Sequence, residues 1–580
     1  MHRSLLLSAL CVFLVSQLAG ADEARTVANL RLKGADGKTW TLDEPTDAKA
    51  IVVFFLGTQC PVNNAYLPRL AELHAAYAPK GVTFVAINSN EHDSADAIRE
   101  HAKKHKLPFA VLKDDGQRAA AKFGAERVPE AFVLDAGRVI RYQGRIDDQY
   151  GIGYLRPQAS KRYLVDALEE VLAGKKVTQA KVAVEGCYIT KAPPTKAGGS
   201  VTYAKHVAPI LQNRCQECHR PGQIGPMPLL SYDDASSWSQ MIKDVVADKR
   251  MPPWHADPKY GKFFNDRSLS AGDRETLLAW IDQGCPKGAD KDAPAPRKFS
   301  EGWRMGEPDA VVTMTKEFMV PAQAPRGGIP YKHVIVPTNF DEDKWIQAAE
   351  CKPGNPAVVH HIIVFVVVGN KRVKDIADGI GSGMLVAFAP GDFGSVYPAG
   401  SAKRIPKGAS LVFQMHYTPN GVAQSDRSSV GFIFAKEPPK HEVKTKAIAQ
   451  QILVIQPGGD NQKFQSVATF RKDALIWNLT PHMHLRGKSF EYQAVYPDGK
   501  RVPILSVPRY DFAWQASYRF EKPLLLPAGS RIECTAHFDN SAKNPNNPDP
   551  TKLVLWGEQT WEEMMIGFVD YTYVDSAEKK

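Results

Sequence analysis

The chain has 580 residues, of which 43% are hydrophobic, 23% charged and 9% aromatic. This composition is typical of globular proteins and excludes a disordered or fibrous chain, and the length predicts about three or four domains. Lysine and arginine (73) outnumber aspartate and glutamate (63), which gives a net charge of +10. The basic residues are scattered and form no runs, so the charge favours solubility and we expect no nucleic-acid partner.

The first residues are typical of a signal peptide. His2 and Arg3 precede an apolar stretch from Leu5 to Leu18, and Ala19-Gly20-Ala21 follows as a cleavage site. We therefore assign residues 1–21 to a signal peptide. No later stretch approaches the roughly 20 apolar residues that a membrane span needs. The sequence predicts a periplasmic or secreted protein, in a compartment where disulfides persist and haem can be attached.

Two stretches rich in Pro, Gly, Ala and Lys are typical of linkers. They predict a multidomain fold, because each block that they leave is long enough to bury its own core. The predicted linkers are residues 190–200 and 289–302, and the predicted domains are residues 25–189, 201–288, 303–440 and 441–574.

The first block has the pattern of an α/β domain. Apolar runs at Ile51–Leu56, Val82–Ile87 and Ala131–Leu134 alternate with helix-period stretches at Tyr66–Tyr77 and Ala95–Lys104. This order predicts a sheet flanked by helices.

Cys60 is the candidate redox residue of this block. It follows the first apolar run in Phe54-Phe55-Leu56-Gly57-Thr58-Gln59-Cys60-Pro61 and precedes a helix, whose N-terminus would lower the pKa of the thiol. The block resembles the thioredoxin-like redoxin and peroxiredoxin family over about residues 25–174, with Val128-Pro129 at the place of the family's cis-proline. The resemblance implies a thioredoxin-like fold and a redox role for Cys60.

Two departures from that family limit the chemistry. Asn63 stands where thioredoxins have their second cysteine, which excludes exchange by a Cys-x-x-Cys pair, and Thr58 is one residue closer to Cys60 than in peroxiredoxins. Cys187 is the candidate resolving cysteine or disulfide partner of Cys60. A scaffold in which Cys60 is bridged or idle is the alternative.

The middle block is predicted to be helical, with candidate helices at Val207–Leu211, Trp238–Val246 and Arg274–Ile281. It contains the Cys-x-x-Cys-His motif of Cys215, Cys218 and His219. In such a motif the two thiols bind haem as thioethers and the imidazole is an iron ligand. The block resembles a small all-α c-type cytochrome domain, which implies one covalent haem.

The sixth ligand of this haem is less well determined by the sequence. Met251, in Met251-Pro252-Pro253-Trp254, is the first choice, since a thioether raises the haem potential into the range of an electron carrier. Met227 and His255 are the rivals. Zinc bound by Cys215, Cys218 and two distant ligands is the alternative to haem.

The third block carries short alternating runs bounded by Pro, Gly and Asn, at Lys332–Pro337, Val359–Val368 and Ile532–Phe538. They predict antiparallel β-sandwiches. Five of the 16 histidines cluster in this block, which indicates metal sites. The clustered histidines are His360, His361, His416, His482 and His484.

The spacing of these histidines predicts which of their side chains can face the same metal ion. In an extended strand His482 and His484 point to the same face, whereas the neighbours His360 and His361 need a local twist or bulge to share one ion. Neutral imidazoles suit Cu, Zn, Ni or Fe, and a thioether in addition favours Cu(I).

Residues 303–574 resemble the copper type II ascorbate-dependent monooxygenases, the family of the peptidylglycine-hydroxylating and dopamine β-monooxygenases. The resemblance implies two jelly-roll β-sandwich domains and two copper ions. It places the first copper on three histidines and the second on two histidines and a methionine, all six in the family's order. The implied ligands are His360, His361 and His416 for the first copper, and His482, His484 and Met564 for the second.

This chain departs from the peptide-hydroxylating branch where that branch grips a substrate carboxylate. Thr480, Ile566 and Phe568 stand at those positions, so a carboxylate would find no charged donor there, and a peptidylglycine substrate is disfavoured. Met565 stands where the family has a cysteine, so Cys534 loses its expected disulfide partner.

The function predicted from the sequence is that of an exported oxidoreductase. We expect a copper-dependent monooxygenase that inserts one atom of O2 into a C–H bond of a small-molecule substrate. The family uses ascorbate as electron donor, and here the fused haem would relay electrons from a periplasmic partner to the first copper. Two alternatives stay open, namely a copper and haem electron-transfer or copper-binding protein without turnover, and a thiol peroxidase acting at Cys60.

Overall fold

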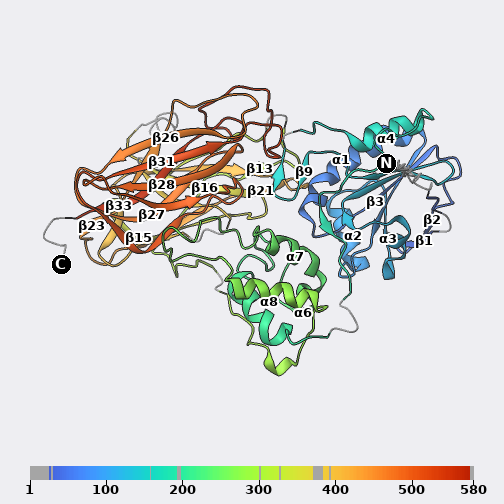
Figure 1. Cartoon of the computed structure of the whole chain (residues 1–580), viewed down its shortest axis with the longest axis horizontal. Coiled ribbons are helices and arrows are strands. Elements are labelled where there is room, and N and C mark those ends of the chain that lie inside the picture. The colour runs from blue at the N-terminus through green and yellow to red at the C-terminus, as the bar shows by residue number, and fades with distance from the viewer. Residues whose placement is uncertain are drawn as a thin grey trace, which may run out of the picture.

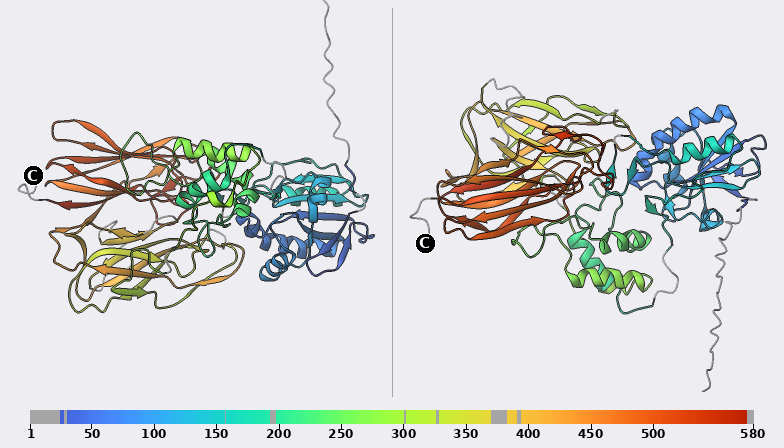
Figure 2. Two further views of the ribbon diagram at one scale, coloured as in Figure 1. Left: turned by 90° about the horizontal axis from the view of Figure 1, so that it is seen from below. Right: turned by 45° about the horizontal axis from the view of Figure 1, so that its top comes forward.

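The computed structural model describes residues 25–27, 30–156, 158–192, 198–299, 302–325, 328–369, 383–390 and 394–574. The predicted signal peptide lies outside the described residues. Figures 1 and 2 show an α/β domain at one end of the molecule, a β-rich region at the other end, and a helical block that touches both.

The first domain is built on a mixed sheet with strand order β2-β1-β5-β4-β3-β7-β8. Its central strand β3 reads Ala-Ile-Val-Val-Phe-Phe and is buried at every position, because both faces of the sheet are covered. The predicted α/β fold is confirmed. The sheet strands are β1 (Arg31–Gly34), β2 (Thr39–Thr41), β3 (Ala50–Phe55), β4 (Val82–Asn88), β5 (Ala110–Lys113), β7 (Glu130–Asp135) and β8 (Ile140–Gly144). The helices are α1 (Pro61–Tyr77), α2 (Ala95–Lys104), α3 (Arg118–Phe123) and α4 (Tyr163–Leu172), with the short elements η1 (Ala78–Lys80), η2 (Asp115–Gln117), β6 (Arg127–Val128), β9 (Tyr150–Gly151), β10 (Tyr154–Leu155) and β11 (Cys187–Tyr188).

The middle block is helical, as predicted. Its helices are η3 (Tyr203–Val207), α5 (Ala208–Arg214), α6 (Tyr232–Ser237), α7 (Ser239–Ala247), α8 (Ala271–Asp282) and the short turn η4 (Asp290–Asp292). Apolar side chains of these helices share one continuous core with the first domain. Trp238 of this block lies against His92 of the first domain, with 5.3 Å between the ring centroids.

The two stretches predicted as linkers are held against the domains where the structure describes them. The Thr190 amide donates a hydrogen bond to Asn90 Oδ1 (2.9 Å), and Thr190 is buried in the first domain. In the second stretch, Arg297 binds the Gln212 carbonyl (2.8 Å) and the Glu217 carboxylate (2.6 Å). A composition rich in Pro and Gly predicts an irregular backbone, but it does not prevent that backbone from forming such contacts.

The β-rich region holds two successive pairs of sheets, each pair with its own core. Pairing is antiparallel except between β19 and β23. The first pair contains β12 (Ala310–Thr313), β22 (Ser429–Phe434), β15 (Lys344–Lys352), β18 (Ser395–Val396), β19 (Ser401–Ile405) and β23 (His441–Glu442) in one sheet, and β14 (Lys332–Pro337), β20 (Ser410–Tyr417), β16 (Val359–Val367) and β17 (Met384–Phe388) in the other, with β13 (Phe318–Val320) and β21 (Gln424–Asp426) beside them. The second pair contains β24 (Lys444–Ala449), β33 (Ile566–Tyr573), β27 (Ala474–His482) and β30 (Tyr518–Leu526) in one sheet, and β26 (Gln462–Thr469), β31 (Arg531–Phe538), β28 (Gly487–Val495) and β29 (Arg501–Val507) in the other, with β25 (Val454–Ile455) and β32 (Val554–Leu555) beside them.

The segment that follows Met251 leaves the helical block and docks on the second sheet pair. The Trp254 ring lies 4.9 Å from that of Tyr518 between centroids. The backbone is held as well, because the Asp257 amide donates to Ser506 (2.8 Å) and the Phe264 amide to Arg519 (2.7 Å). The predicted sixth-ligand segment is therefore anchored on the β-rich region.

Candidate functional site

Three of the predicted metal ligands lie on two neighbouring strands. His360 and His361 are on β16, and His416 is on β20, directly opposite His361. The register between these strands shifts between Val359 and His361, which is the β-bulge that the sequence required. A bulge turns one side chain out of the normal alternation, so adjacent histidines can face one site.

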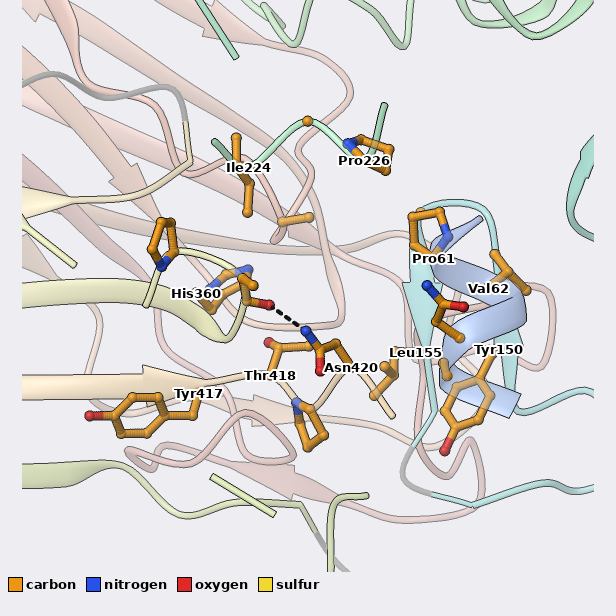
Figure 3. Close-up of a pocket in the computed structure, with 18 of the residues that line it drawn as sticks. Pro61, Val62, Tyr150, Leu155, Ile224, Pro226, His360, Tyr417, Thr418 and Asn420 are labelled. Carbon is orange, nitrogen blue, oxygen red and sulfur yellow. Dashed lines mark hydrogen bonds between the residues drawn. The ribbon is translucent and has the colours of Figure 1, made fainter. Parts of the chain in front are cut away.

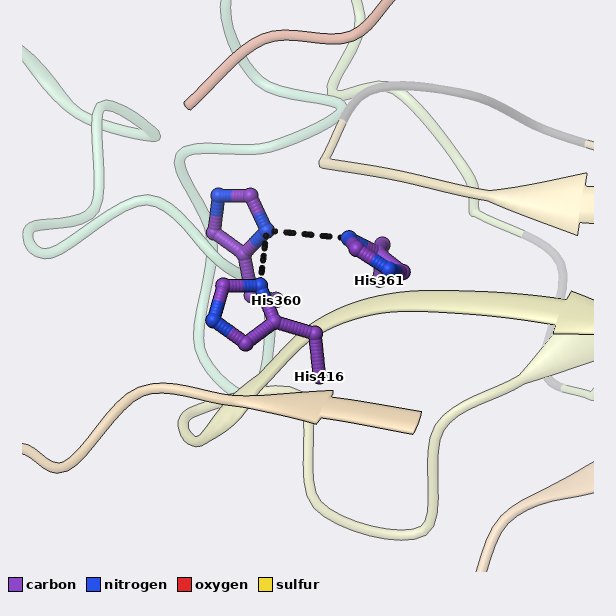
Figure 4. Close-up of side chains that lie close together, drawn as sticks. All are labelled: His360, His361 and His416. Atoms are coloured by element: carbon purple, nitrogen blue, oxygen red, sulfur yellow. Dashed lines mark hydrogen bonds between the residues drawn. The ribbon is translucent and has the colours of Figure 1, made fainter. Parts of the chain in front are cut away.

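The Nδ1 atoms of the three histidines converge (Figure 4). His360 Nδ1 lies 3.5 Å from His361 Nδ1 and 3.2 Å from His416 Nδ1, and the three ligand atoms all lie within 4.8 Å of one another. Two imidazole nitrogens bound at about 2.0 Å to one tetrahedral ion are about 3.3 Å apart. The two short separations therefore fit three nitrogens of one coordination shell.

Burial keeps these imidazoles in the form that can bind a metal. It lowers the pKa of His360 to about 4. For His361 and His416 burial, together with the neighbouring histidines, lowers the pKa well below the usual value. Neutral rings keep a free lone pair. The Nε2 atom of His361 is buried without a hydrogen-bond partner, which is costly unless the ring has another role.

The second histidine pair lies at the end of β27. The strand ends at His482, so His484 is placed by the turn that follows and not by strand alternation. The rings still approach each other, with 5.1 Å between centroids. His482 Nδ1 lies 2.5 Å from Gln515 Oε1, and His484 Nδ1 lies 3.2 Å from the Glu562 carbonyl. Each acceptor fixes the tautomer with Nε2 unprotonated and available as a ligand.

The segment that contains Met564 is fixed beside this pair. Glu563 is buried, and its carboxylate accepts the amides of His484 (2.8 Å) and Arg486 (2.6 Å). Met564 follows directly and is half-buried. Its coordination of a metal stays a prediction.

Two aromatic residues that the sequence analysis missed lie between the two histidine sets. The Tyr331 ring is 5.0 Å from that of His416 and 6.3 Å from that of His484. The Phe512 ring stacks on His360 at 5.1 Å and meets His484 edge-on at 5.9 Å. The two sets therefore face one another across a thin aromatic layer. The only sequence signal was the run Arg509-Tyr510-Asp511-Phe512-Ala513-Trp514-Gln515, which is dense in aromatics.

The thiol site lies in the first domain, where Cys60 is the N-cap of α1. Its Sγ is 3.5 Å from the Asn63 amide, and its thiol lies 3.3 Å from the Val128 carbonyl, beside the cis bond to Pro129. Strand β11 pairs with β6 so that Cys187 lies opposite Val128. This pairing brings the Cys60 and Cys187 thiols into hydrogen-bond contact, which the sequence left undetermined.

The two thiols differ in acidity. Burial alone would raise the pKa of Cys60, but hydrogen bonds from the Cys187 thiol and from backbone amides outweigh it and lower the pKa. The hydrogen bond to Cys60 and burial raise the pKa of Cys187 well above its usual value. Cys60 is therefore the more acidic thiol of the pair and Cys187 the less acidic one.

Comparisons with known proteins place the first domain. Residues 24–143 match the AhpC/TSA family. The first domain is a thioredoxin-like redoxin domain. The chain is 30% identical over 93 residues to the thiol-disulfide oxidoreductase ResA of Bacillus thuringiensis, a match that covers 16% of this chain and 53% of ResA. It is 26% identical over 121 residues to a chloroplastic peroxiredoxin Q of Triticum aestivum, covering 20% of this chain and 54% of that protein. The chain thus spans about half the length of these curated relatives.

Two solved structures are similar to part of this chain. A hypothetical protein of Sinorhizobium meliloti is 31% identical, with 29% of this chain and 92% of that chain covered and a TM-score of 0.26. A thiol:disulfide interchange protein DsbE from Chlorobium tepidum, described as putative, is 18% identical, with 26% and 96% covered and a TM-score of 0.21.

The haem motif lies at the end of α5. His219 Nδ1 is 3.1 Å from the Met227 carbonyl, which fixes the ring and leaves Nε2 as the free nitrogen. Burial raises the pKa of the Cys215 thiol to about 12. Coordination of a haem iron by Met251, Met227 or His255 stays a prediction. In the part of the chain that the structure describes, no helix has the length and apolarity needed to cross a bilayer.

Proposed function

We propose that this chain is an exported, copper-dependent monooxygenase that acts on a small organic substrate. The observation that carries the proposal is the convergence of the His360, His361 and His416 Nδ1 atoms opposite a second, separately oriented histidine pair. When bound, copper at these two sites would supply two one-electron carriers and the activation of O2 for insertion into a C–H bond. Ligand softness favours copper, because Met564 adds a thioether to the second set.

The chain's own residues set up this chemistry in three ways. Gln515 and the Glu562 carbonyl hold the His482 and His484 rings with Nε2 unprotonated and available as a ligand. The bulge in β16 keeps His360 and His361 on one ion. Tyr331 and Phe512 hold the imidazole rings in place, since both aromatic rings pack directly on predicted ligand histidines.

The middle block is proposed to deliver electrons through a covalent haem on Cys215, Cys218 and His219. The bond from His219 to the Met227 carbonyl supports this assignment, because it orients the imidazole as an iron ligand. The same bond holds Met227 on the Nδ1 side of the ring and thus favours Met251 as the sixth ligand. The loop from Arg509 to Gln515 connects the middle block with the second histidine pair and so supports a path for electrons to copper. At one end Arg509 donates to the Asp248 carbonyl (3.2 Å), and at the other Gln515 contacts His482.

The decisive experiment measures copper and covalent haem per chain on the full protein matured in a periplasm. We expect two coppers and one haem in the parent, and about one copper fewer in His416→Ala and in His482→Ala. The control is His537→Ala, a partly buried β31 histidine that contacts Ser489 and should leave both coppers bound. A full copper content in both ligand variants would overturn the proposal.

Oxygen consumption separates catalysis from storage. A copper-loaded parent that takes up O2 in the presence of ascorbate and an organic substrate, with His482→Ala inactive, would support the monooxygenase. Full copper loading without O2 uptake would instead favour a copper-binding or electron-transfer protein. Turnover that is unchanged in His219→Ala would exclude the haem relay.

A second candidate function rests on the contact between Cys60 and Cys187. In a thiol peroxidase, the Cys60 thiolate attacks the peroxide and becomes a sulfenic acid as water leaves. The Cys187 thiol then displaces water to close a disulfide, which an external thiol must reduce. Peroxide consumption with dithiothreitol should be lost in Cys60→Ser and should leave a sulfenic acid at Cys60 in Cys187→Ser. Equal rates in the parent and both variants would exclude this activity.

A further inference from the structure

A cavity of about 900 Å³ lies where the redoxin domain, the middle block and the β-rich region meet. Figure 3 shows its walls. The N-terminus of α1 lines one side with Pro61 and Val62, and the loop after the haem motif contributes Ile224. His360 and His416 line the opposite side, so the cavity reaches the first histidine set.

The lining is largely apolar. Each of the three parts contributes hydrocarbon side chains or aromatic rings. These include Val62 and Leu155 from the redoxin domain, Ile224 from the middle block, and Ile329, Leu485 and Phe512 from the β-rich region. A cavity with such walls favours a ligand that exchanges water for hydrocarbon contact.

The lining contains few charged side chains. Arg220 pairs with Glu217 at 3.5 Å, and the Lys104 side chain is exposed at the surface. Burial raises the pKa of Asp511, which disfavours its charged form. The Asn420 amide already donates to the Ala357 carbonyl (3.3 Å). The Nε atom of Arg220 has no hydrogen-bond partner, and a charged ligand would find few other groups here to replace its hydration.

The size of the cavity fits a small molecule. Ligand pockets of proteins span about 300–1,000 Å³, so this one can enclose an organic molecule at the upper end of that range. Cys215, Cys218 and His219 are not among the described residues that line it. Met227 does line it, and the Met227 carbonyl lies 3.1 Å from His219 Nδ1, so the cavity borders the Cys-x-x-Cys-His motif.

We propose that this cavity binds an uncharged, largely apolar organic molecule beside His360 and His416, with the redoxin domain as one of its walls. The proposal deepens the proposed function and depends on it only in one respect, namely that the neighbouring histidines hold copper. The redoxin domain then forms part of the ligand-binding site, because Val62 lines the cavity. This role is separate from any thiol chemistry at Cys60.

The test uses two probes with the same ring system and different charge. N-phenyl-1-naphthylamine is neutral, and 8-anilinonaphthalene-1-sulfonate carries a sulfonate. Calorimetric titration of the full, metal-loaded chain should give tighter binding of the neutral probe by about tenfold or more. Equal or tighter binding of the sulfonate would overturn the ligand class.

Two variants fill the cavity from different domains. Val62→Trp and Ile224→Trp should each weaken binding of the neutral probe by about tenfold or more. The control is Val467→Trp on the exposed outer face of β26, where Val467 is 59% exposed, and it should bind as the parent does. Because Ile224 is only partly buried on a loop, its variant keeps the test valid if Val62→Trp fails to fold. Binding that neither variant weakens would overturn the cavity assignment.

Proton NMR of the bound neutral probe separates this proposal from the copper assignment. Cu(II) at the first histidine set should broaden the probe's signals beyond those in the Zn(II)-loaded protein, while the haem is the same in both samples. Equal line widths, together with loss of binding in the two tryptophan variants, would uphold the cavity and contradict copper at that site. Broadening by Cu(II) without sensitivity to the variants would uphold copper and overturn the cavity.

Discussion

The side-chain oxygen of Gln515 lies 2.5 Å from His482 Nδ1, although the two residues come from a loop and from the end of a strand. This contact leaves Nε2 as the unprotonated nitrogen of the His482 ring. Gln515→Leu removes the acceptor, so we expect weaker copper binding at the second site by about 10–100-fold, the usual effect of losing such a partner.

Competition with a Cu(I) chelator checks this prediction. Gln515→Glu keeps an acceptor at the same place and should restore most of the affinity. Gln493→Leu is the control, because Gln493 binds Arg501 on β29 (2.8 Å) and should leave copper affinity unchanged. An unaltered affinity in Gln515→Leu would mean that the contact does not orient the ligand.

Lys403 and Asp570 form a buried ion pair that joins the two sheet pairs. Their atoms are 3.2 Å apart, and each side chain is 6% exposed. The Lys403 ammonium also donates to the Met384 and Leu385 carbonyls, both at 3.1 Å. Lys403→Met leaves the Asp570 carboxylate without its cation, so we expect the unfolding free energy to fall by about 3–5 kcal/mol.

Denaturation followed by tryptophan fluorescence measures that loss. The double variant Lys403→Met/Asp570→Leu removes both charges and should recover a large part of the stability, because no unpaired buried charge remains. A single variant as stable as the parent would show that the pair adds nothing to the junction.

The hydrogen bond from Cys187 lowers the pKa of Cys60 in spite of burial. The thiolate is the form that alkylates, so in the parent labelling of Cys60 by iodoacetamide should reach half its maximal rate below pH 9. Cys187→Ala removes the hydrogen bond and leaves burial as the main influence, which shifts the midpoint to higher pH. Peptide mass spectrometry across pH 6–11 gives both midpoints, and a midpoint that stays in place would contradict the role of Cys187.

Much of this arrangement could be read from the sequence because it is local. The position of Cys60 follows from an apolar run that ends just before a helical pattern, and the structure places it as the N-cap of α1. The need for a bulge at His360 and His361 follows from strand alternation alone, and the register of β16 and β20 contains it.

The rest depends on contacts between distant segments. Cys60 meets Cys187 only because β11 returns to pair with β6, and no pattern at either cysteine indicates that pairing. Tyr331 and Gln515 lie outside any metal-binding motif, and their roles arise from where their loops pack. The contacts of Thr190 and Arg297 in the two predicted linkers depend on distant segments too, and composition does not indicate them.

Trp254 holds the segment after Met251 on the β-rich region through its contact with Tyr518. Trp254→Ala removes this packing, so the segment should detach more often while the rest of the fold persists. The amides of Asp257 and Phe264, which bond to Ser506 and Arg519, should exchange with deuterium faster by about tenfold or more. Phe264→Ala is the matched control, because Phe264 is 78% exposed in the same segment and its ring adds little to the docking. Exchange that is equally slow in both variants would mean that the backbone bonds alone anchor the segment. Faster exchange in Trp254→Ala alone would instead show that the Trp254 ring anchors the segment. The β-rich region would then control the position of Met251, the predicted sixth haem ligand.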